Sequence, residues 1–225
     1  MNYHIGNMLI YQEFVPGNDC PLCRIRNIQE KRLAEQYLNE SVMDDFQRRM
    51  VNEKGFCLHH TQMLLARPNK LSVALQHITR LTALKGKLEI TADPKRAAKT
   101  AETFLHCKDT CVICDGVEVN MIRYYKTVAE MFLAEKDFKQ TLQNTDGFCL
   151  EHFGSLLRYA SFAGRRKKDY IYTLTSLEKK SMEKLLTDLQ RFAAKHDYRN
   201  ADLPWEGAEK ALERSVVKLH GEQAK

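Results

Sequence analysis

The 225-residue sequence predicts an all-α fold made of two homologous helical repeats, each held by a Cys₃His site, followed by a C-terminal helix. Apolar residues recur mainly at helical spacing, and the alternation typical of strands is scarce. One pattern of cysteine and histidine occurs once in each half of the chain, and apolar positions around it recur at the same offset. Repetition of both ligands and core positions indicates that a whole structural unit was duplicated.

The repeated pattern is a C-x-x-C pair followed by the sequence G-F-C-L-x-H. The copies read CPLC with GFCLHH and CVIC with GFCLEH, and 33 or 34 residues separate the pair from the next cysteine. Equivalent donors lie 91 or 92 positions apart. They are Cys20, Cys23, Cys57 and His60 in the first copy and Cys111, Cys114, Cys149 and His152 in the second.

Four helices are expected in the first repeat, residues 1–93. A helix follows the first C-x-x-C, and a shorter one marked by Met43, Phe46 and Met50 ends at Gly55. A third helix begins near Phe56 and ends before Pro68, because proline breaks a helix interior. A long amphipathic stripe then carries Leu71, Leu75, Ile78, Leu81, Leu84 and Leu88.

The same order is expected in the second repeat, residues 94–197, where Pro94 is available to open a helix. Its core positions match those of the first repeat at an offset of 92. The pairs are Phe46 with Phe138, Met50 with Leu142, and Leu64-Leu65 with Leu156-Leu157. A long helix from about residue 170 to 194 ends this repeat. Residues 198–225 are a connection and a final amphipathic helix that Trp205 docks onto the bundle.

Each copy is expected to bind one Zn²⁺ through its own four donors. Three thiolates and one imidazole complete a tetrahedral shell, and a site without an open position is typical of structural zinc. Gly55 and Gly147 place Cys57 and Cys149 at a helix start, where free N–H groups stabilise thiolate. His60 is preferred to His59 as the ligand, because position 59 corresponds to Glu151 and position 60 to His152.

Other readings of the cysteines stay open. An iron–sulfur cluster or a thiol-based redox switch would use the same residues, although clusters are more often bound by cysteine alone. The tetrads could also be buried, reduced cysteines that only pack. A thioredoxin-like role lacks the βαβ context that it needs. Cys107 and His106 have no counterparts in the first repeat and are not assigned as ligands.

Composition and charge narrow the function classes. No apolar run is long enough to span a bilayer, and the N-terminus lacks the features of a secretory signal, so a cytoplasmic protein is expected. The formal net charge is +6, which does not by itself imply nucleic acid. The densest basic run is a candidate contact for nucleic acid or an acidic partner; it comprises Arg165, Arg166, Lys167 and Lys168.

Nothing in the sequence assigns catalysis. It contains no nucleophile elbow, phosphate-binding loop, dinucleotide fingerprint or H-E-x-x-H motif. A hydrolase or transferase would therefore require a pocket that the sequence does not reveal. The favoured function is a non-catalytic interaction or regulatory module with an unknown protein partner.

The tandem arrangement of CPLC with GFCLHH and CVIC with GFCLEH resembles an uncharacterised family of bacterial and archaeal proteins, a domain of unknown function. The resemblance covers about residues 15–220. It implies a helical metal-binding protein and no particular activity, substrate or partner. Val112 stands where the first copy has Pro21, a departure that leaves every ligand in place.

Overall fold

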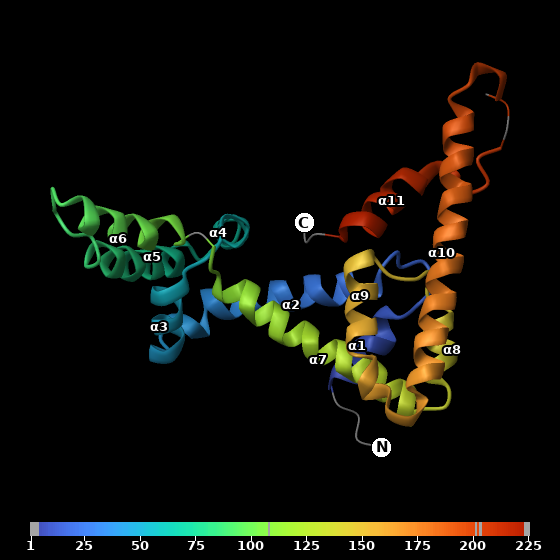
Figure 1. The fold of residues 1–225 in the computed structure, drawn as a ribbon, viewed down its shortest axis with the longest axis horizontal. Helices are drawn as coiled ribbons and strands as arrows, with labels where there is room; N and C mark the ends of the chain where they lie inside the picture. The colour runs from blue at the N-terminus through green and yellow to red at the C-terminus, as the bar shows by residue number, and fades with distance from the viewer. Residues whose placement is uncertain (1–4, 108, 201, 203, 223–225) are drawn as a thin grey trace. The chain divides into compact units, whose positions relative to one another are not determined.

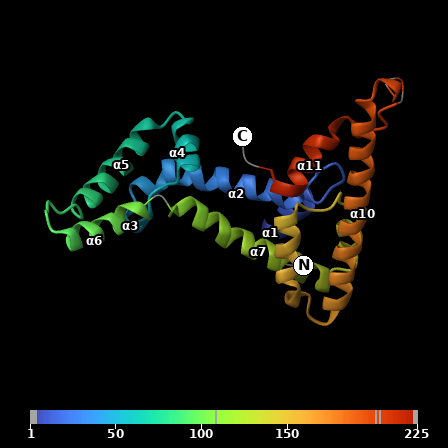
Figure 2. The same ribbon diagram turned by 45° about the horizontal axis from the view of Figure 1, so that its top comes forward.

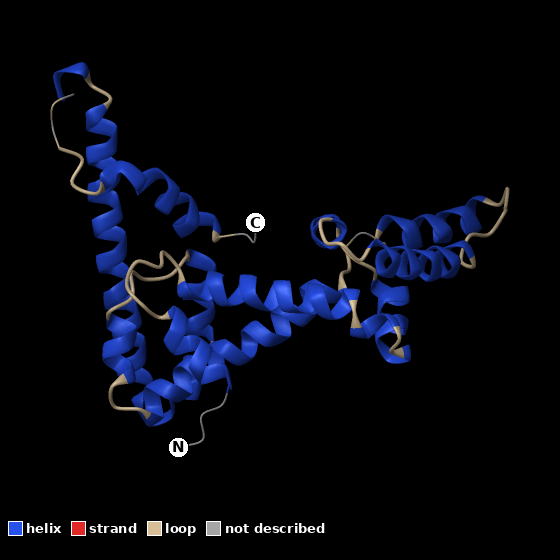
Figure 3. Cartoon of the chain, turned by 180° about the vertical axis from the view of Figure 1, so that it is seen from behind, coloured by secondary structure: helices blue, strands red, loops and turns tan. Residues whose placement is uncertain are grey.

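The computed structural model confirms the all-α class. It describes residues 5–107, 109–200, 202 and 204–222, and these form helices and loops without a strand (Figure 3). None of the helices in this described part is long and apolar enough to cross a membrane. The chain divides into two compact units, and each unit is described separately below.

The units do not follow the predicted repeats. One unit combines residues 1–27 with 121–225, and the other comprises residues 28–120. The boundaries fall within the helices Pro21–Leu38 and Val112–Ala134 (α2 and α7), not at the predicted positions 93 and 197. Each unit therefore takes one part from each half of the sequence. We call the discontinuous unit unit 1 and the continuous one unit 2.

Unit 1 is organised around α10, the long helix that the sequence predicts near residues 170–194 (Figure 1). Helices α8, α9 and α11 each contact it. The core holds the fully buried Phe132, Phe138, Phe148 and Tyr170. The elements of this unit are α1 (Ile5–Glu13), the start of α2, the end of α7, α8 (Phe138–Gln143), α9 (Leu150–Arg158), η2 (Ala160–Arg166), α10 (Lys167–Lys195), η3 (Tyr198–Asn200), η4 (Ala208–Lys210) and α11 (Ala211–His220).

Two features of unit 1 bear on the predictions. Helix α1 was not predicted, yet Leu9 and Ile10 are buried and Phe14, just beyond it, packs against Phe138 and Phe148. Trp205 lies 5.7 Å from the ring of Phe192 on α10, as expected for a residue that docks the C-terminal segment. The C-terminal segment is therefore part of the packed unit.

Unit 2 contains shorter helices whose ends follow local sequence signals. Asp44 caps the start of α3, and Gly55 ends it with φ 71°. Asp93 caps α6, whose first residue is Pro94, as predicted. The elements are the end of α2, η1 (Glu40–Val42), α3 (Asp45–Lys54), α4 (Leu58–Leu65), α5 (Lys70–Lys85), α6 (Pro94–Leu105) and the start of α7.

Several predicted core positions of unit 2 are exposed. Met43 and Phe46 are 86 % and 60 % exposed, whereas Phe138, the counterpart of Phe46 in the second repeat, is fully buried. Met50 is half-buried, whereas its counterpart Leu142 is fully buried. Leu64 and Leu156 are buried in both copies. The predicted match of core positions therefore fails at Phe46, because the two helices have different neighbours: α3 packs with α5 and η1, whereas α8 packs with α10.

Candidate metal centres

The structure gathers all eight predicted donors into two groups, but it exchanges their partners. The first centre consists of Cys20, Cys23, Cys149 and His152, and it lies in unit 1. The second centre consists of Cys57, His60, Cys111 and Cys114, and it lies in unit 2. In each group the ligand atoms lie within 4.8 Å of one another.

The predicted pairing within each repeat is therefore wrong. The C-x-x-C pair of one copy meets the G-F-C-L-x-H element of the other copy. This exchange follows from the division of the chain, because residues 20–23 belong to the unit that contains residues 149–152. The intervening residues 28–120 form the other unit around the remaining four donors.

Local structure places both kinds of donor at helix starts. Cys20 precedes α2 and its carbonyl accepts a hydrogen bond from the Cys23 N–H, so both sulfurs project from one turn. Cys57 and Cys149 are the N-cap residues of α4 and α9, one position before the predicted first turn. The histidine three residues later then lies on the same helical face as its cysteine.

Gly147 allows the turn before Cys149 to pack closely against α10. Its φ is 96°, and a Cβ at this position would lie 2.7 Å from Ser181 Oγ and 3.0 Å from Glu178 Oε2. Any larger residue would therefore push the G-F-C turn away from α10. The next residue is held on both sides, since Phe148 donates its N–H to Glu178 and its carbonyl accepts from Lys218.

Distances within the first centre fit the edges of one tetrahedron. His152 Nδ1 lies 3.4 Å from Cys20 Sγ, 3.4 Å from Cys23 Sγ and 3.1 Å from Cys149 Sγ. The sulfurs of Cys23 and Cys149 are 3.7 Å apart. Tetrahedral zinc bonds imply about 3.8 Å between sulfurs and about 3.5 Å between sulfur and nitrogen. All the cysteines are free, so no disulfide brings these atoms together.

The second centre has the same geometry. His60 Nδ1 lies 3.1 Å from Cys57 Sγ and 3.4 Å from the sulfurs of Cys111 and Cys114. The sulfurs of Cys57 and Cys114 are 3.9 Å apart. Both groups can therefore hold one metal ion through three sulfurs and the Nδ1 atom of a histidine.

In the first centre, the surroundings of the three cysteines disfavour the formation of more than one thiolate. Burial raises the pKa of Cys20 well above its usual value, and the hydrogen bond with Cys149 raises the pKa of Cys23 to about 12. The pKa of Cys149 is lowered, because the thiols of Cys20 and Cys23 hydrogen-bond to its thiolate. One thiolate therefore forms readily, and full deprotonation requires a cation among the sulfurs.

The second centre behaves similarly and adds a carboxylate. Partial desolvation and the neighbouring Cys111 raise the pKa of Cys114. Burial also acts to raise the pKa of Cys111, but the hydrogen bond with His60 and backbone N–H groups of Cys114 and Cys57 together outweigh it and lower this pKa to about 6. Glu30 Oε1 lies 2.8 Å from His60 Nε2 and fixes the orientation of the ring. Sequence reasoning missed Glu30, because its place in α2 gives no sign that it faces a histidine 30 residues away.

The remaining candidates belong to neither group of four donors, although His59 forms a smaller group with Glu30 and His60. His59 is exposed, as predicted, and its Nε2 atom lies 3.3 Å from Glu30. Cys107 is half-buried beyond the end of α6, where it lines a cavity of about 320 Å³ together with Phe56, His77, Arg80 and other residues of unit 2. Carboxylates are absent from the described lining of this cavity, so it offers no acid–base pair for the hydrolase reading.

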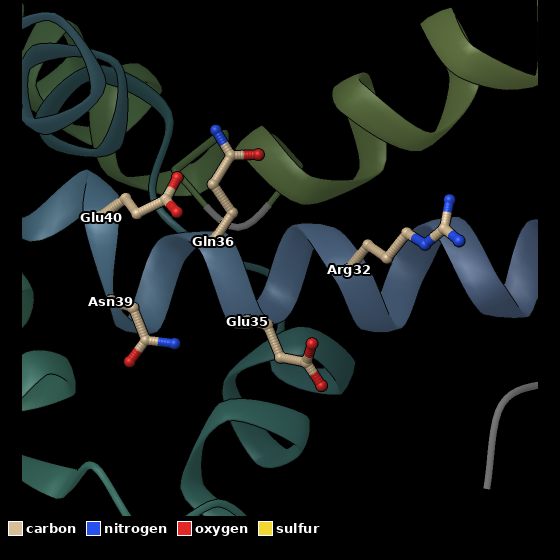
Figure 4. Close-up of a pocket in the computed structure, with 5 residues that line it drawn as sticks. All are labelled: Arg32, Glu35, Gln36, Asn39 and Glu40. Atoms are coloured by element: carbon tan, nitrogen blue, oxygen red, sulfur yellow. The ribbon is translucent and has the colours of Figure 1, made fainter. Parts of the chain in front are cut away.

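A second hollow of about 320 Å³ runs along α2. Figure 4 shows its five polar lining residues: Arg32, Glu35 and Gln36 on α2, Asn39 in the turn after α2, and Glu40 at the start of η1. Glu35 is occupied by an ion pair with Arg67 at 2.7 Å.

The predicted basic run is only partly available to a partner. The Arg166 side chain hydrogen-bonds to the Phe132 carbonyl and to Asp169, and its guanidinium lies 4.3 Å above the Phe132 ring. Arg165, Lys167 and Lys168 are exposed. Arg166 thus anchors the start of α10 to α7, and the other three remain candidate contacts for nucleic acid or an acidic protein.

Comparisons with known proteins agree with the resemblance seen in the sequence. A model described as "Family of unknown function (DUF6062)" matches residues 1–225. The chain is also similar to the "Uncharacterized 23.9 kDa protein in xynA 3'region" of Caldicellulosiruptor sp. (strain Rt8B.4), with 24 % identity over 182 residues. That match covers 80 % of this chain and 84 % of the relative. No solved structure matches the chain significantly.

Proposed function

Because the chain belongs to DUF6062, a family of unknown function, we propose a function from its own residues. It is a non-catalytic helical protein stabilised by two zinc ions, and it works as an interaction or regulatory module. The observation that carries the zinc assignment is the convergence of three sulfurs and one Nδ1 atom, twice, at distances that suit one tetrahedral ion.

The donor set favours zinc over an iron–sulfur cluster. The donors of a cluster bind different iron atoms and therefore stand farther apart than the donors of a single ion. Here all four ligand atoms of each centre lie within 4.8 Å of one another. Four protein donors also leave no open position for a substrate or an activated water, which supports a structural role.

Protein purified without metal-affinity steps should contain close to two zinc ions per chain, one for each group of donors. Mass spectrometry of the metals checks this directly, and Co²⁺ substitution should give the visible absorption of a tetrahedral thiolate site. Cys107→Ser is the matched control, because this cysteine belongs to neither centre. Protein that contains iron and inorganic sulfide in place of zinc would contradict the assignment.

Helix α5 supports the interaction role. Leu71, Leu75 and Ile78 share one face at i, i+4 and i+7, and they are 69 %, 37 % and 59 % exposed. The buried face of the helix is partly polar, since Gln76 donates its amide hydrogen to the Tyr37 carbonyl at 2.7 Å. Contiguous apolar side chains left in solvent are a feature of protein-binding surfaces. We assign this stripe to a partner that contributes an amphipathic helix.

A photo-reactive amino acid placed at Ile78 should cross-link a partner protein in cells, whereas the same group at the exposed Lys31 should not. Changing Leu75 and Leu71 to glutamine in the same chain should abolish the adduct. Because both side chains are exposed, the double change should alter the free energy of unfolding by less than about 1 kcal/mol. Equal cross-linking from Ile78 and Lys31 would contradict the assignment of the stripe.

A further inference from the structure

The two centres differ in how well their sulfurs are protected. All four donors of the first centre are buried. In the second centre Cys111 and His60 are buried, but Cys57 is half-buried and Cys114 is exposed. Oxidation of cysteine follows exposure and thiolate character, and a zinc-bound sulfur is a thiolate. The second centre therefore presents a reactive sulfur to solvent, and the first does not.

The C-terminal segment adds to the protection of the first centre. Helix α11 ends close to the C-terminus of the chain (Figure 2). Two residues beyond it, Glu222 donates its backbone N–H to Cys23 Sγ at 3.3 Å. Gly221 adopts φ 77° and ψ 174°, a conformation essentially restricted to glycine. A Cβ at Gly221 would lie 3.5 Å from Cys23 Sγ and 3.8 Å from Cys149 Sγ. The backbone of this segment thus lies directly against two of the sulfurs.

We propose that the second centre is an oxidation site for hydroperoxides, at which Cys114 and Cys57 form a disulfide and the zinc ion is released. This inference rests on the proposed zinc binding. The two sulfurs are 3.9 Å apart, so a small movement brings them to the S–S bond length of about 2.05 Å. The chain then senses peroxide through one centre and keeps its fold through the other.

The chemistry proceeds in two steps. The Cys114 thiolate attacks one oxygen of hydrogen peroxide and becomes a sulfenic acid, while the O–O bond breaks and the leaving hydroxide takes one proton to form water. The Cys57 thiolate then attacks the Cys114 sulfur, and the sulfenic oxygen leaves as a second water after protonation. Two thiolates, one hydrogen peroxide and two protons thus give one disulfide and two waters. A zinc ion held by the four donors would then be left with Cys111 and His60 alone, too few ligands to retain it.

The test is a titration of the zinc-loaded full chain with hydrogen peroxide in the presence of a chromogenic zinc chelator. The zinc content is measured before peroxide is added. This measurement tests zinc binding on its own, so that a failure of the proposed function can be told apart from a failure of the oxidation proposal. About half of the bound zinc should be released in a fast phase, together with a Cys57–Cys114 disulfide identified by peptide mass spectrometry. Dithiothreitol with added zinc should reverse the change. Cys107→Ser should behave like the unaltered chain.

A second variant tests the protection of the first centre. Gly221→Val cannot keep the φ of 77° without strain, so the segment should move away from Cys23. The remaining half of the zinc should then be released by peroxide at least tenfold faster than in the unaltered chain. The proposal is overturned if both ions leave in one phase, if the disulfide joins any other pair, or if peroxide releases no zinc from the folded protein.

Discussion

Changing Cys20 and Cys149 to serine in the same chain should remove one zinc ion, no more than either change removes alone. Both residues belong to the first centre. The first substitution already abolishes zinc binding there, so the second substitution removes no further ion. Cys20→Ser combined with Cys57→Ser should remove both ions, because these residues belong to different centres. This outcome follows only from the exchanged pairing of the two copies, and metal analysis of the four variants measures it.

The same variants should differ strongly in stability. Binding of structural zinc by a Cys/His site is worth about 10 kcal/mol or more, and most of this binding energy contributes to folding. Loss of the first centre should therefore lower the melting temperature sharply and unfold residues around α9, while Cys107→Ser leaves the melt unchanged. If the pairing within each repeat were correct, Cys20→Ser with Cys57→Ser would instead keep one ion, and the exchanged arrangement would be refuted.

The sequence singled out the eight residues that the structure gathers into two groups, but it could not predict how they pair. The two copies have equivalent motifs at nearly equal spacing, so a C-x-x-C pair is chemically as well suited to one G-F-C-L-x-H element as to the other. The choice depends on how α2 and α7 pack with the rest of the chain, and this is a property of tertiary structure. The pairing within each repeat was predicted because those donors are closer in sequence. In the structure, donors of different copies lie together in one unit.

Helix positions could be predicted better than burial. Gly55 ends α3, Pro94 begins α6, and Pro68 lies in the loop between α4 and α5, because their backbone preferences act locally. Gly147 does not end a helix as predicted, since α8 already ends at Gln143. Exposure of Phe46 and burial of Phe138 could not be told apart, since both residues lie at the same place in their repeats. The burial of a side chain depends on which helix packs against it. The sequence of one repeat does not show which helix that is.

Buried polar partners were the hardest features to predict. Lys218 lies in α11 between two apolar residues and reads as part of a solvated face. In the structure it is 7 % exposed, and its Nζ atom lies 2.7 Å from Glu178 Oε1 and 2.9 Å from Ser181 Oγ. The pair joins α11 to α10 and, through Phe148, holds the turn that presents Cys149 to the first centre.

Lys218→Met should reduce the free energy of unfolding by about 3–5 kcal/mol. The change leaves the Glu178 carboxylate, which is 2 % exposed, without its countercharge and leaves the Phe148 carbonyl without a donor. Zinc in the first centre should also pass to a chelator faster, because the turn before Cys149 loses one of its anchors. Urea denaturation and the rate of zinc transfer measure the two effects.

Two further variants separate the buried pair from a general effect of losing a lysine. Lys210→Met removes an exposed lysine just before α11 and should change stability by less than about 1 kcal/mol. Adding Glu178→Gln to Lys218→Met removes the unpaired charge while an amide oxygen remains to accept from Phe148, so much of the lost stability should return. A loss in Lys218→Met no greater than that in Lys210→Met would show that the pair does not hold α11 against α10.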